Sequence, residues 1–335
     1  MNIQQRINAL SLLGEKLNND KLPSSVFRKA EANNRWFVKE SIEFSLSEIS
    51  NMLKKENLEN WVNLYPQINN YAIQKSVGVI MAGNIPLVGF HDFLSVLITG
   101  HKIIVKLSSK DNILLKEITN ILIDIEPQFQ NCISFTEATL KNFDAIIATG
   151  SNNSSKYFEY YFGKYPNIIR KNRTSVAILT GNETEQDFKN LGKDIFTYYG
   201  LGCRNVSKLF VPDDYNFVPF LDALSEFEYV YINNKYANNR DYNSSVLLLN
   251  KVKHYDNNFL ILTENLGYSA PISVVYFETY SNIETVYKSM EINNEKIQCI
   301  VSNISDKFIN FGGAQSPSLN DYADNIDTLE FLLEL

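Results

Sequence analysis

Short apolar runs alternate with segments of helical length between residues 71 and 151, and this alternation constrains the fold more than any other feature of the sequence. The apolar runs cover residues 71–83, 101–109, 132–138 and 144–151, and helix-like segments at 86–100 and 112–125 separate the first three. Short strands joined by helices are typical of a parallel sheet with helices on its faces. The sequence therefore predicts an α/β fold here.

Open parallel sheets bind their ligands beyond the carboxyl ends of the strands. The predicted strand ends with polar or small residues are Gly83-Asn84, Lys106 to Ser109, and Gly150-Ser151. These residues suit a binding site, although an ordinary turn or a helix cap also explains them. Neither GxGxxG nor GxxxxGK[ST] occurs in the sequence, so a nucleotide bound here does not use either standard phosphate loop.

The rest of the chain extends this pattern. Residues 1–70 read as helices, a strand is expected at 175–180, a helix at 184–199 and a strand after Cys203. Later strands are expected at 227–232, 245–249, 260–262, 272–277 and 297–302, with a helix at 281–291. We expect two domains, residues 1–172 and 173–335.

Composition and charge exclude several classes of function. Hydrophobic residues make up 44% of the 335 residues and charged residues 21%, a balance typical of a globular protein. The formal charge of −7 has the wrong sign for a protein that neutralises nucleic-acid phosphates. We therefore expect no nucleic-acid partner.

Cysteine and histidine spacing gives no disulfide framework and no metal motif. The three cysteines lie far apart, and the three histidines form no HxH or HExxH pattern. No secretion signal and no window of about 18–20 apolar residues is visible. These features favour a cytoplasmic protein without a metal or a membrane span.

Cys203 is the strongest candidate nucleophile. Gly200 and Gly202 leave room around the thiol, and the loop can direct backbone N–H groups at a developing oxyanion. Arg204 favours the thiolate over the thiol. The alternative is a small buried hydrophobic residue, which is how we interpret Cys132 and Cys299 in their apolar runs.

Six segments occur in an order that resembles one enzyme superfamily. They are AGNIPL (82–87), IIVKLSSKD (103–111), ATGS (148–151), GLGC (200–203), ENLGYSAPISVVYF (264–277) and FGGAQSP (311–317). The chain resembles the aldehyde dehydrogenases over about residues 70–330, and more closely their LuxC-type acyl-CoA reductase branch, the fatty acyl reductases. The resemblance implies a Rossmann-like NAD(P)-binding domain after the N-terminal helices, within residues 1–172. It also implies a mixed α/β catalytic domain in 173–335, with the active site between the two.

The resemblance also implies a role for individual residues. Cys203 takes the acyl group as a thioester, and Asn84 stabilises the oxyanion together with the Cys203 backbone N–H. In the cofactor site, the resemblance implies that Lys106 binds the adenosine ribose, and Ser108 and Ser109 belong to the polar group of residues that follows it. Gly150 and Ser151 are expected at the pyrophosphate. Glu264 is expected at the nicotinamide ribose.

Two departures from the oxidative relatives favour reduction by NADPH. Those relatives carry a glutamate some thirty-odd residues before the nucleophile to activate water, whereas residues 167–173 here read NIIRKNR. An enzyme that must keep its thioester intact has a reason to lack that base. NAD-preferring relatives place an acidic residue three positions after the lysine, whereas Ser109 and Lys110 here suit a 2′-phosphate. We therefore expect NADPH rather than NADH.

Together these features predict reduction of an acyl-CoA or acyl-protein thioester to an aldehyde through an acyl-cysteine on Cys203. The alternatives are a CoA-acylating or oxidising aldehyde dehydrogenase and a non-catalytic binding protein of the same fold. A partner enzyme that supplies the acyl group is a further expectation. A homo-oligomer is expected too, with the apolar tail 327–335 as a candidate interface. A basic cluster at Arg170, Lys171 and Arg173 is either a CoA phosphate contact or a solvated turn.

Overall fold

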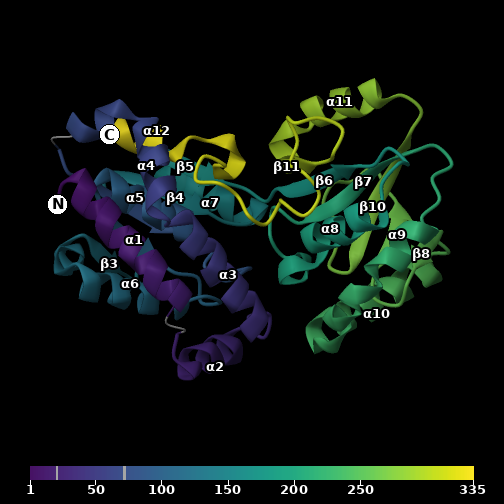
Figure 1. The fold of residues 1–335 in the computed structure, drawn as a ribbon, viewed down its shortest axis with the longest axis horizontal. Helices are drawn as coiled ribbons and strands as arrows, with labels where there is room; N and C mark the ends of the chain where they lie inside the picture. The colour runs from purple at the N-terminus through teal and green to yellow at the C-terminus, as the bar shows by residue number, and fades with distance from the viewer. Residues whose placement is uncertain (20–21, 71–72) are drawn as a thin grey trace. The chain divides into compact units, whose positions relative to one another are not determined.

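The chain divides into two compact units in a computed structural model that describes residues 1–19, 22–70 and 73–335 (Figure 1). Unit 1 comprises Met1–Asn172 and Ser318–Leu335, and unit 2 comprises Arg173–Pro317. The predicted N-terminal helix ends at Asp20 and the first predicted apolar run begins at Tyr71 and Ala72, and these three residues lie outside the described ranges.

Helices build the N-terminal part of unit 1. They are α1 (Ile3–Asn19), α2 (Ser24–Asn33), α3 (Lys39–Met52), α4 (Lys55–Asn63) and the 3-10 helix η1 (Pro66–Asn70). Leu10 and Leu13 lie one turn apart on α1 and are fully buried in the unit's core. A Cβ on Gly14 would lie 2.7 Å from the Leu53 Cβ, so the glycine allows α1 to approach the end of α3 closely.

A parallel sheet forms the centre of unit 1. In its described part, five strands follow the order β3-β2-β1-β4-β5, and every pairing is parallel. The strands are β1 (Ser76–Ile80), β2 (Lys102–Lys106), β3 (Ile133–Phe135), β4 (Ala145–Thr149) and β5 (Asn167–Arg170). The connecting helices are α5 (Phe90–Thr99), α6 (Leu114–Ile125), η2 (Pro127–Asn131) and α7 (Asn152–Phe162). The predicted parallel α/β sheet is confirmed.

The helix predicted from residue 86 begins later, at Phe90. Residues 86–89 form a turn in which Leu87 has a φ of 58°. The Leu87 N–H donates to a carboxylate oxygen of Asp111 at 2.8 Å. This long-range bond holds a turn that local hydrophobic periodicity cannot indicate.

The C-terminal segment packs with unit 1, not with residues 173–317 as the sequence suggested. Its helix α12 (Thr328–Leu333) packs against α5, and Figure 1 shows it in yellow near α4. The Leu332 carbonyl oxygen lies 2.9 Å from the His101 Nε2, and Leu329 and Leu332 are fully buried. Burial of these leucines removes the reason for predicting the tail as an interface.

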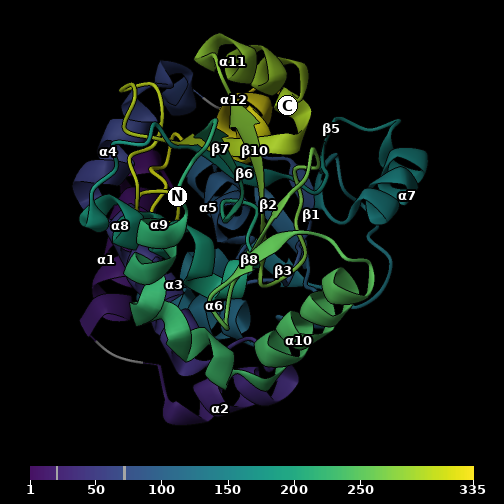
Figure 2. The same ribbon diagram turned by 90° about the vertical axis from the view of Figure 1, so that its right-hand side faces the viewer.

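Unit 2 has a mixed sheet between two helical layers. Throughout residues 173–317 the strand order is β11-β6-β7-β10-β9-β8, and only the β8–β9 pair is antiparallel. The strands are β6 (Thr174–Ile178), β7 (Val206–Pro212), β8 (His254–Asp256), β9 (Ile261–Glu264), β10 (Val274–Tyr280) and β11 (Ile297–Val301). The helix α11 (Ile283–Ile292) covers one face, and α8 (Glu185–Phe196) and α9 (Val218–Ala223) cover the other (Figures 1 and 2).

Two predicted strands of unit 2 are wrong. Residues 227–232 belong to the 3-10 helix η4 (Leu224–Ile232), where Leu224, Phe227 and Val230 recur at every third position and are buried. Residues 245–249 form the end of α10 (Asn234–Leu249). Aromatic and branched residues favour strands in both segments, and packing overrides that preference.

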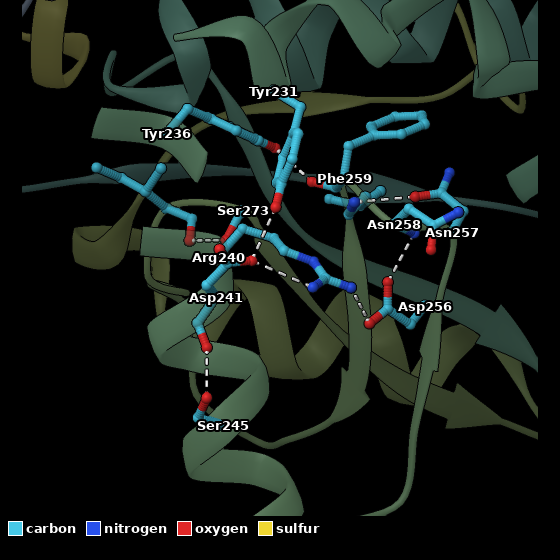
Figure 3. A network of polar contacts seen from close by, with 12 residues as sticks. Tyr231, Tyr236, Arg240, Asp241, Ser245, Asp256, Asn257, Asn258, Phe259 and Ser273 are labelled. Atoms are coloured by element: carbon cyan, nitrogen blue, oxygen red, sulfur yellow. Dashed lines mark hydrogen bonds and ion pairs between the residues drawn. The ribbon is translucent and has the colours of Figure 1, made fainter. Parts of the chain in front are cut away.

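Polar contacts fix α10 to its neighbours in unit 2 (Figure 3). Arg240 donates to a carboxylate oxygen of Asp256 on β8 at 2.5 Å, and the Tyr231 hydroxyl of η4 donates to Asp241 at 3.0 Å. The helix thereby joins β8 to η4. No helix within residues 1–19, 22–70 and 73–335 is long and apolar enough to cross a membrane.

Candidate functional site

The loop that carries Cys203 has a strained backbone. Tyr198, Tyr199 and Gly200 have φ angles of 55°, 58° and 76°, so three consecutive residues occupy the left-handed region. Residues other than glycine rarely adopt that region, and such strain is concentrated at functional sites. Cys203 follows this turn, after Leu201 and Gly202. It is half-buried and lies shortly before β7, which begins at Val206.

Asn205 holds this loop in place. Its side-chain amide donates to the carbonyl oxygens of Asp194, Ile195 and Thr197 at 3.0, 3.2 and 2.9 Å, at the end of α8. Its side-chain oxygen accepts the Gly202 N–H at 2.8 Å. Asn205 is buried, so these bonds replace contacts with water and fix the residue directly before Cys203.

The backbone of Cys203 itself is held from β6. The Ser175 hydroxyl donates to the Cys203 carbonyl oxygen at 3.0 Å and lies 2.9 Å from the Cys299 Sγ. The Ser175 N–H also donates to the Asn205 carbonyl oxygen at 3.2 Å. Cys299 on β11 therefore contacts the serine that holds the Cys203 backbone.

Residues 311–315 pack against the same loop through Asp194. The buried Asp194 carboxylate accepts the N–H groups of Gly312 and Ala314 at 2.6 and 2.9 Å. The Arg204 Nε donates to the Ala314 carbonyl oxygen at 2.5 Å. Burial raises the pKa of Asp194 to about 6, and the two hydrogen bonds oppose that shift. Arg204, which we expected to act on the thiol, thus has a structural partner.

Sequence reasoning missed Asp194 and Asn205. Both are polar residues beside apolar positions, and a buried polar residue must find hydrogen-bond partners. The aspartate within the helical segment 184–199 and the asparagine two residues after Cys203 were the available signals.

Glu264 ends β9 in the same unit and is exposed. Its backbone pairs in register with Phe277 of β10. The residues that follow, Asn265 to Gly267, are also exposed and form a short loop. The carboxylate therefore lies at an accessible strand end, as a nucleotide contact requires.

In unit 1 the structure brings the Asn84 segment to the polar segment after β2. A Cβ on Gly83 would lie 2.7 Å from the Ser108 side chain, so the glycine permits this contact. Asp111 connects the two segments through the Leu87 N–H, and burial raises its pKa to about 6. Asn84 is half-buried in the turn that follows β1.

Lys106 ends β2 in register with Ile80 of β1. Its ammonium donates to the Ala138 carbonyl oxygen at 3.0 Å and to that of Glu137 at 3.5 Å. Ser108 is half-buried, whereas Ser109 is exposed. These donors lie at the carboxyl end of the central strands of the sheet.

Gly150 and Ser151 connect β4 to α7. A Cβ on Gly150 would lie 2.8 Å from both Phe158 and Ser154, so only glycine allows α7 to start this close to the strand. The Ser151 hydroxyl caps α7 by accepting the Ser154 N–H at 3.2 Å. Both residues therefore have a structural role in addition to any contact with a phosphate.

The basic residues Arg170, Lys171 and Arg173 each have a protein partner. Arg170 is buried and its guanidinium donates to Asp92 on α5 at 2.5 Å and to the Thr328 hydroxyl at 2.9 Å. Lys171 pairs with Glu159 at 2.9 Å, and Arg173 donates to the Ile297 carbonyl oxygen at 3.2 Å. Burial removes Arg170 from any contact with CoA, whereas a CoA contact at Lys171 and Arg173 stays a prediction.

The predicted residues fall into two groups. Asn84, Lys106, Ser108, Ser109, Gly150 and Ser151 belong to unit 1, and Cys203 and Glu264 belong to unit 2. Within unit 1 the Asn84 and Ser108 segments are in contact. Within unit 2 Cys203 lies before β7 and Glu264 ends β9, two strands away in the sheet.

Solved structures of aldehyde dehydrogenases share this fold. Aldehyde dehydrogenase 21 from Physcomitrella patens, in complex with the product succinate, aligns with a TM-score of 0.70 and 12% identity over 100% of this chain and 84% of its own. Indole-3-acetaldehyde dehydrogenase AldA from P. syringae, a variant in complex with NAD+ and IAA, aligns with a TM-score of 0.63 and 12% identity over 86% of this chain and 70% of its own. An aldehyde dehydrogenase from Bacillus cereus in its NAD+ complex gives a TM-score of 0.61 and 13% identity over 86% and 69% of the two chains. A search of curated protein sequences finds no significant match.

The protein therefore has an aldehyde dehydrogenase fold. The family model for acyl-CoA reductase (LuxC) matches residues 13–227, and the chain belongs to this family of oxidoreductases. The matched range includes every predicted site residue except Glu264.

Proposed function

We propose that the protein reduces an acyl thioester, a fatty acyl-CoA or an acyl-protein, to an aldehyde with NADPH, through an acyl group held on Cys203. The observation that carries the proposal is the match to the acyl-CoA reductase family over residues 13–227, which includes Cys203 and its loop. The ordering of that loop by Asn205 and Ser175 supports the assignment of Cys203 as the nucleophile.

In the first half of the reaction, the Cys203 thiolate attacks the carbonyl carbon of the thioester. Asn84 and the Cys203 backbone N–H donate hydrogen bonds to the oxyanion, and the carbon–sulfur bond to the carrier breaks. The carrier leaves as a thiol, and the acyl group remains on Sγ. The strained turn at Tyr198 to Gly200 presents the thiol on a loop fixed before the substrate arrives, which lowers the cost of ordering it.

The donor groups at the strand ends of unit 1 fit a phosphorylated nucleotide. Lys106 and Lys110 offer ammonium groups, and Ser109 and Ser151 offer hydroxyls. The carboxylate of this segment, Asp111, is buried and bonded to Leu87, so it does not face a 2′-phosphate. We propose that Lys106, Ser108, Ser109, Gly150 and Ser151 hold NADPH, with Glu264 at the nicotinamide ribose. Bound NADPH supplies the hydride that reduces the acyl-cysteine.

The segment 167–173 supports reduction over hydrolysis. It contains no carboxylate, and its basic residues Arg170 and Lys171 are engaged with Asp92 and Glu159. A general base that activates water on the thioester is therefore missing from the position where oxidative relatives carry one. The acyl group on Cys203 then persists until reduction releases the aldehyde and restores the thiol.

Turnover with a series of fatty acyl-CoAs tests this function. The protein is mixed with NADPH and acyl-CoAs of increasing chain length, and free CoA, aldehyde and oxidised nucleotide are measured together. The proposal predicts equal amounts of the three and a preferred chain length. Carboxylic acid in place of aldehyde would identify an oxidising or hydrolytic enzyme, and acyl-CoA binding without any product would identify a binding protein.

A further inference from the structure

Lys208 on β7 is a fully buried lysine, with an exposure of 0%. Its ammonium lies 2.5 Å from the Glu278 carboxylate on β10. It also donates to the backbone carbonyl oxygens of Asn265 and Leu266, at 3.3 and 3.2 Å. A buried charge is costly unless it is paired and hydrogen-bonded, and Lys208 meets both conditions.

Aromatic rings and a second residue of β7 complete this arrangement. The Lys208 ammonium lies 5.0 Å from the centre of the Phe210 ring and 4.8 Å from that of Tyr268, within the range of cation–π attraction. The adjacent Ser207 donates its hydroxyl hydrogen to the Tyr268 carbonyl oxygen at 2.7 Å. The strand that follows Cys203 therefore holds both ends of the segment 265–268.

Residues 265–267 of this segment are exposed, whereas Tyr268 is buried. Leu266 has 77% of its surface exposed, and Gly267 is exposed beside it. The Gly267 N–H donates to the Asn265 side-chain oxygen at 2.7 Å, a local turn that does not tie the segment to the sheet. A segment with so little burial is mobile unless groups such as Lys208 hold it.

We propose that Lys208 is a positioning residue for the nucleotide: by holding the Asn265 and Leu266 carbonyl oxygens, it fixes the loop that begins at Glu264 and so orients the Glu264 carboxylate for the nicotinamide ribose. This inference rests on the proposed function, because it takes Glu264 as the ribose contact. Lys208 acts through the loop and does not touch the reacting atoms. This role also gives a reason for a fully buried charged residue on β7.

The test separates nucleotide binding from acyl transfer. Lys208→Met removes the donors and keeps a long apolar side chain, and the exposed Lys253→Met is the matched control. We expect the Kd for NADPH, measured by fluorescence titration without an acyl donor, to rise about tenfold in Lys208→Met alone, since the loop is no longer ordered before binding. The rate at which acyl-CoA acylates Cys203 should stay within about twofold of the wild type. An unchanged Kd, or a parallel loss of acylation, overturns the inference.

Amide hydrogen exchange gives a readout without any ligand. In the wild type the Asn265 N–H donates to the Phe277 carbonyl oxygen at 3.0 Å and the Gly267 N–H to Asn265. Both amides should exchange at least about tenfold faster in Lys208→Met, with β6 and β11 unchanged. Equal exchange in the two proteins contradicts the proposed hold on the loop.

A double-mutant cycle identifies the residue through which Lys208 acts. If Lys208 works through Glu264, then Lys208→Met should change the NADPH Kd much less when Glu264 is already alanine. Fully additive effects would mean that the two residues act independently and would overturn the inference.

A second variant covers the case in which Lys208→Met does not fold because Glu278 is left without its partner. Removing both charges leaves neither the buried Lys208 position nor the half-buried Glu278 position with an unpaired charge, so Lys208→Met/Glu278→Met should fold and still bind NADPH weakly. Wild-type affinity in this folded variant overturns the inference. Failure of the proposed function has a different signature: the wild type itself then neither binds NADPH nor becomes acylated.

Discussion

Asp194 and Ala314, 120 residues apart in the chain, are joined by a hydrogen bond of 2.9 Å from the Ala314 N–H to the buried carboxylate. The carbonyl oxygen of the same Ala314 accepts from Arg204, the neighbour of Cys203. The Asp194 carbonyl oxygen in turn accepts from Asn205. One aspartate thus joins α8, the Cys203 loop and the segment 311–315.

The ionisation of Asp194 should make stability depend on pH. Burial raises the pKa of its carboxyl to about 6, above the ordinary value of 3.8. The folded state therefore binds this proton more tightly than the unfolded state. The resulting stabilisation of the folded protein is greatest in acid and is lost as the pH rises to about 6. Relative to Asp194→Asn, the wild-type free energy of unfolding should fall by roughly 2 kcal/mol between about pH 4.5 and pH 7.5.

Urea unfolding of the two proteins across this pH range measures the difference. Burial also raises the pKa of Asp111 to about 6, but that residue is present in both proteins and its effect cancels. Parallel curves for wild type and Asp194→Asn would contradict the assignment.

The parallel sheet of unit 1 could be predicted because its strands are buried on both faces. In β4 the first four residues are buried, which gives a short continuous apolar run that reads as a strand. Predicting a strand from a short apolar run is wrong at η4. There burial recurs at every third residue, while Tyr229 and Tyr231 are exposed. On α10 only Tyr236 and Ser244 are buried, so the helix carries almost no periodic signal.

Contacts between distant residues could not be predicted. The position of the tail depends on contacts such as the one from the Trp61 Nε1 to the Tyr322 hydroxyl at 2.8 Å, which no local pattern indicates. The strand ends with Asn84, Lys106 and Gly150 could be identified from the sequence, because parallel strands end at one edge of a sheet. Asp194 and Asn205 support the Cys203 loop, and Lys208 supports the loop after Glu264. All three are buried polar residues whose partners appear only once the chain has folded.

Removal of the Asn84 side chain should slow turnover without unfolding the protein. Asn84→Ala deletes one proposed oxyanion donor, and loss of such a donor typically lowers kcat by about a hundredfold or more. Asn120→Ala, at an exposed position on α6, is the control and should retain full activity. Steady-state rates with a fixed acyl-CoA measure the effect, and wild-type turnover in folded Asn84→Ala would exclude the proposed role.

A carboxylate at residue 109 should reverse the nucleotide preference. Ser109 is exposed, so Ser109→Glu places a negative charge where the 2′-phosphate of NADPH is proposed to bind. We expect kcat/KM for NADPH to fall about tenfold or more relative to NADH, because like charges repel at short range. Asn112→Glu adds the same charge at another exposed position nearby and should leave the ratio unchanged. An unaltered ratio in Ser109→Glu would place the 2′-phosphate elsewhere.

The central claim is that Cys203 carries the acyl group, and intact-protein mass spectrometry tests it most directly. Wild type, Cys203→Ala and the control Cys132→Ala are each mixed with acyl-CoAs of different chain length without nucleotide, and NADPH is then added. The account predicts a mass gain of one acyl group on wild type and Cys132→Ala, none on Cys203→Ala, and loss of the adduct when NADPH is added. An adduct on Cys203→Ala, or a folded wild type that gains no mass from any acyl-CoA, would contradict it.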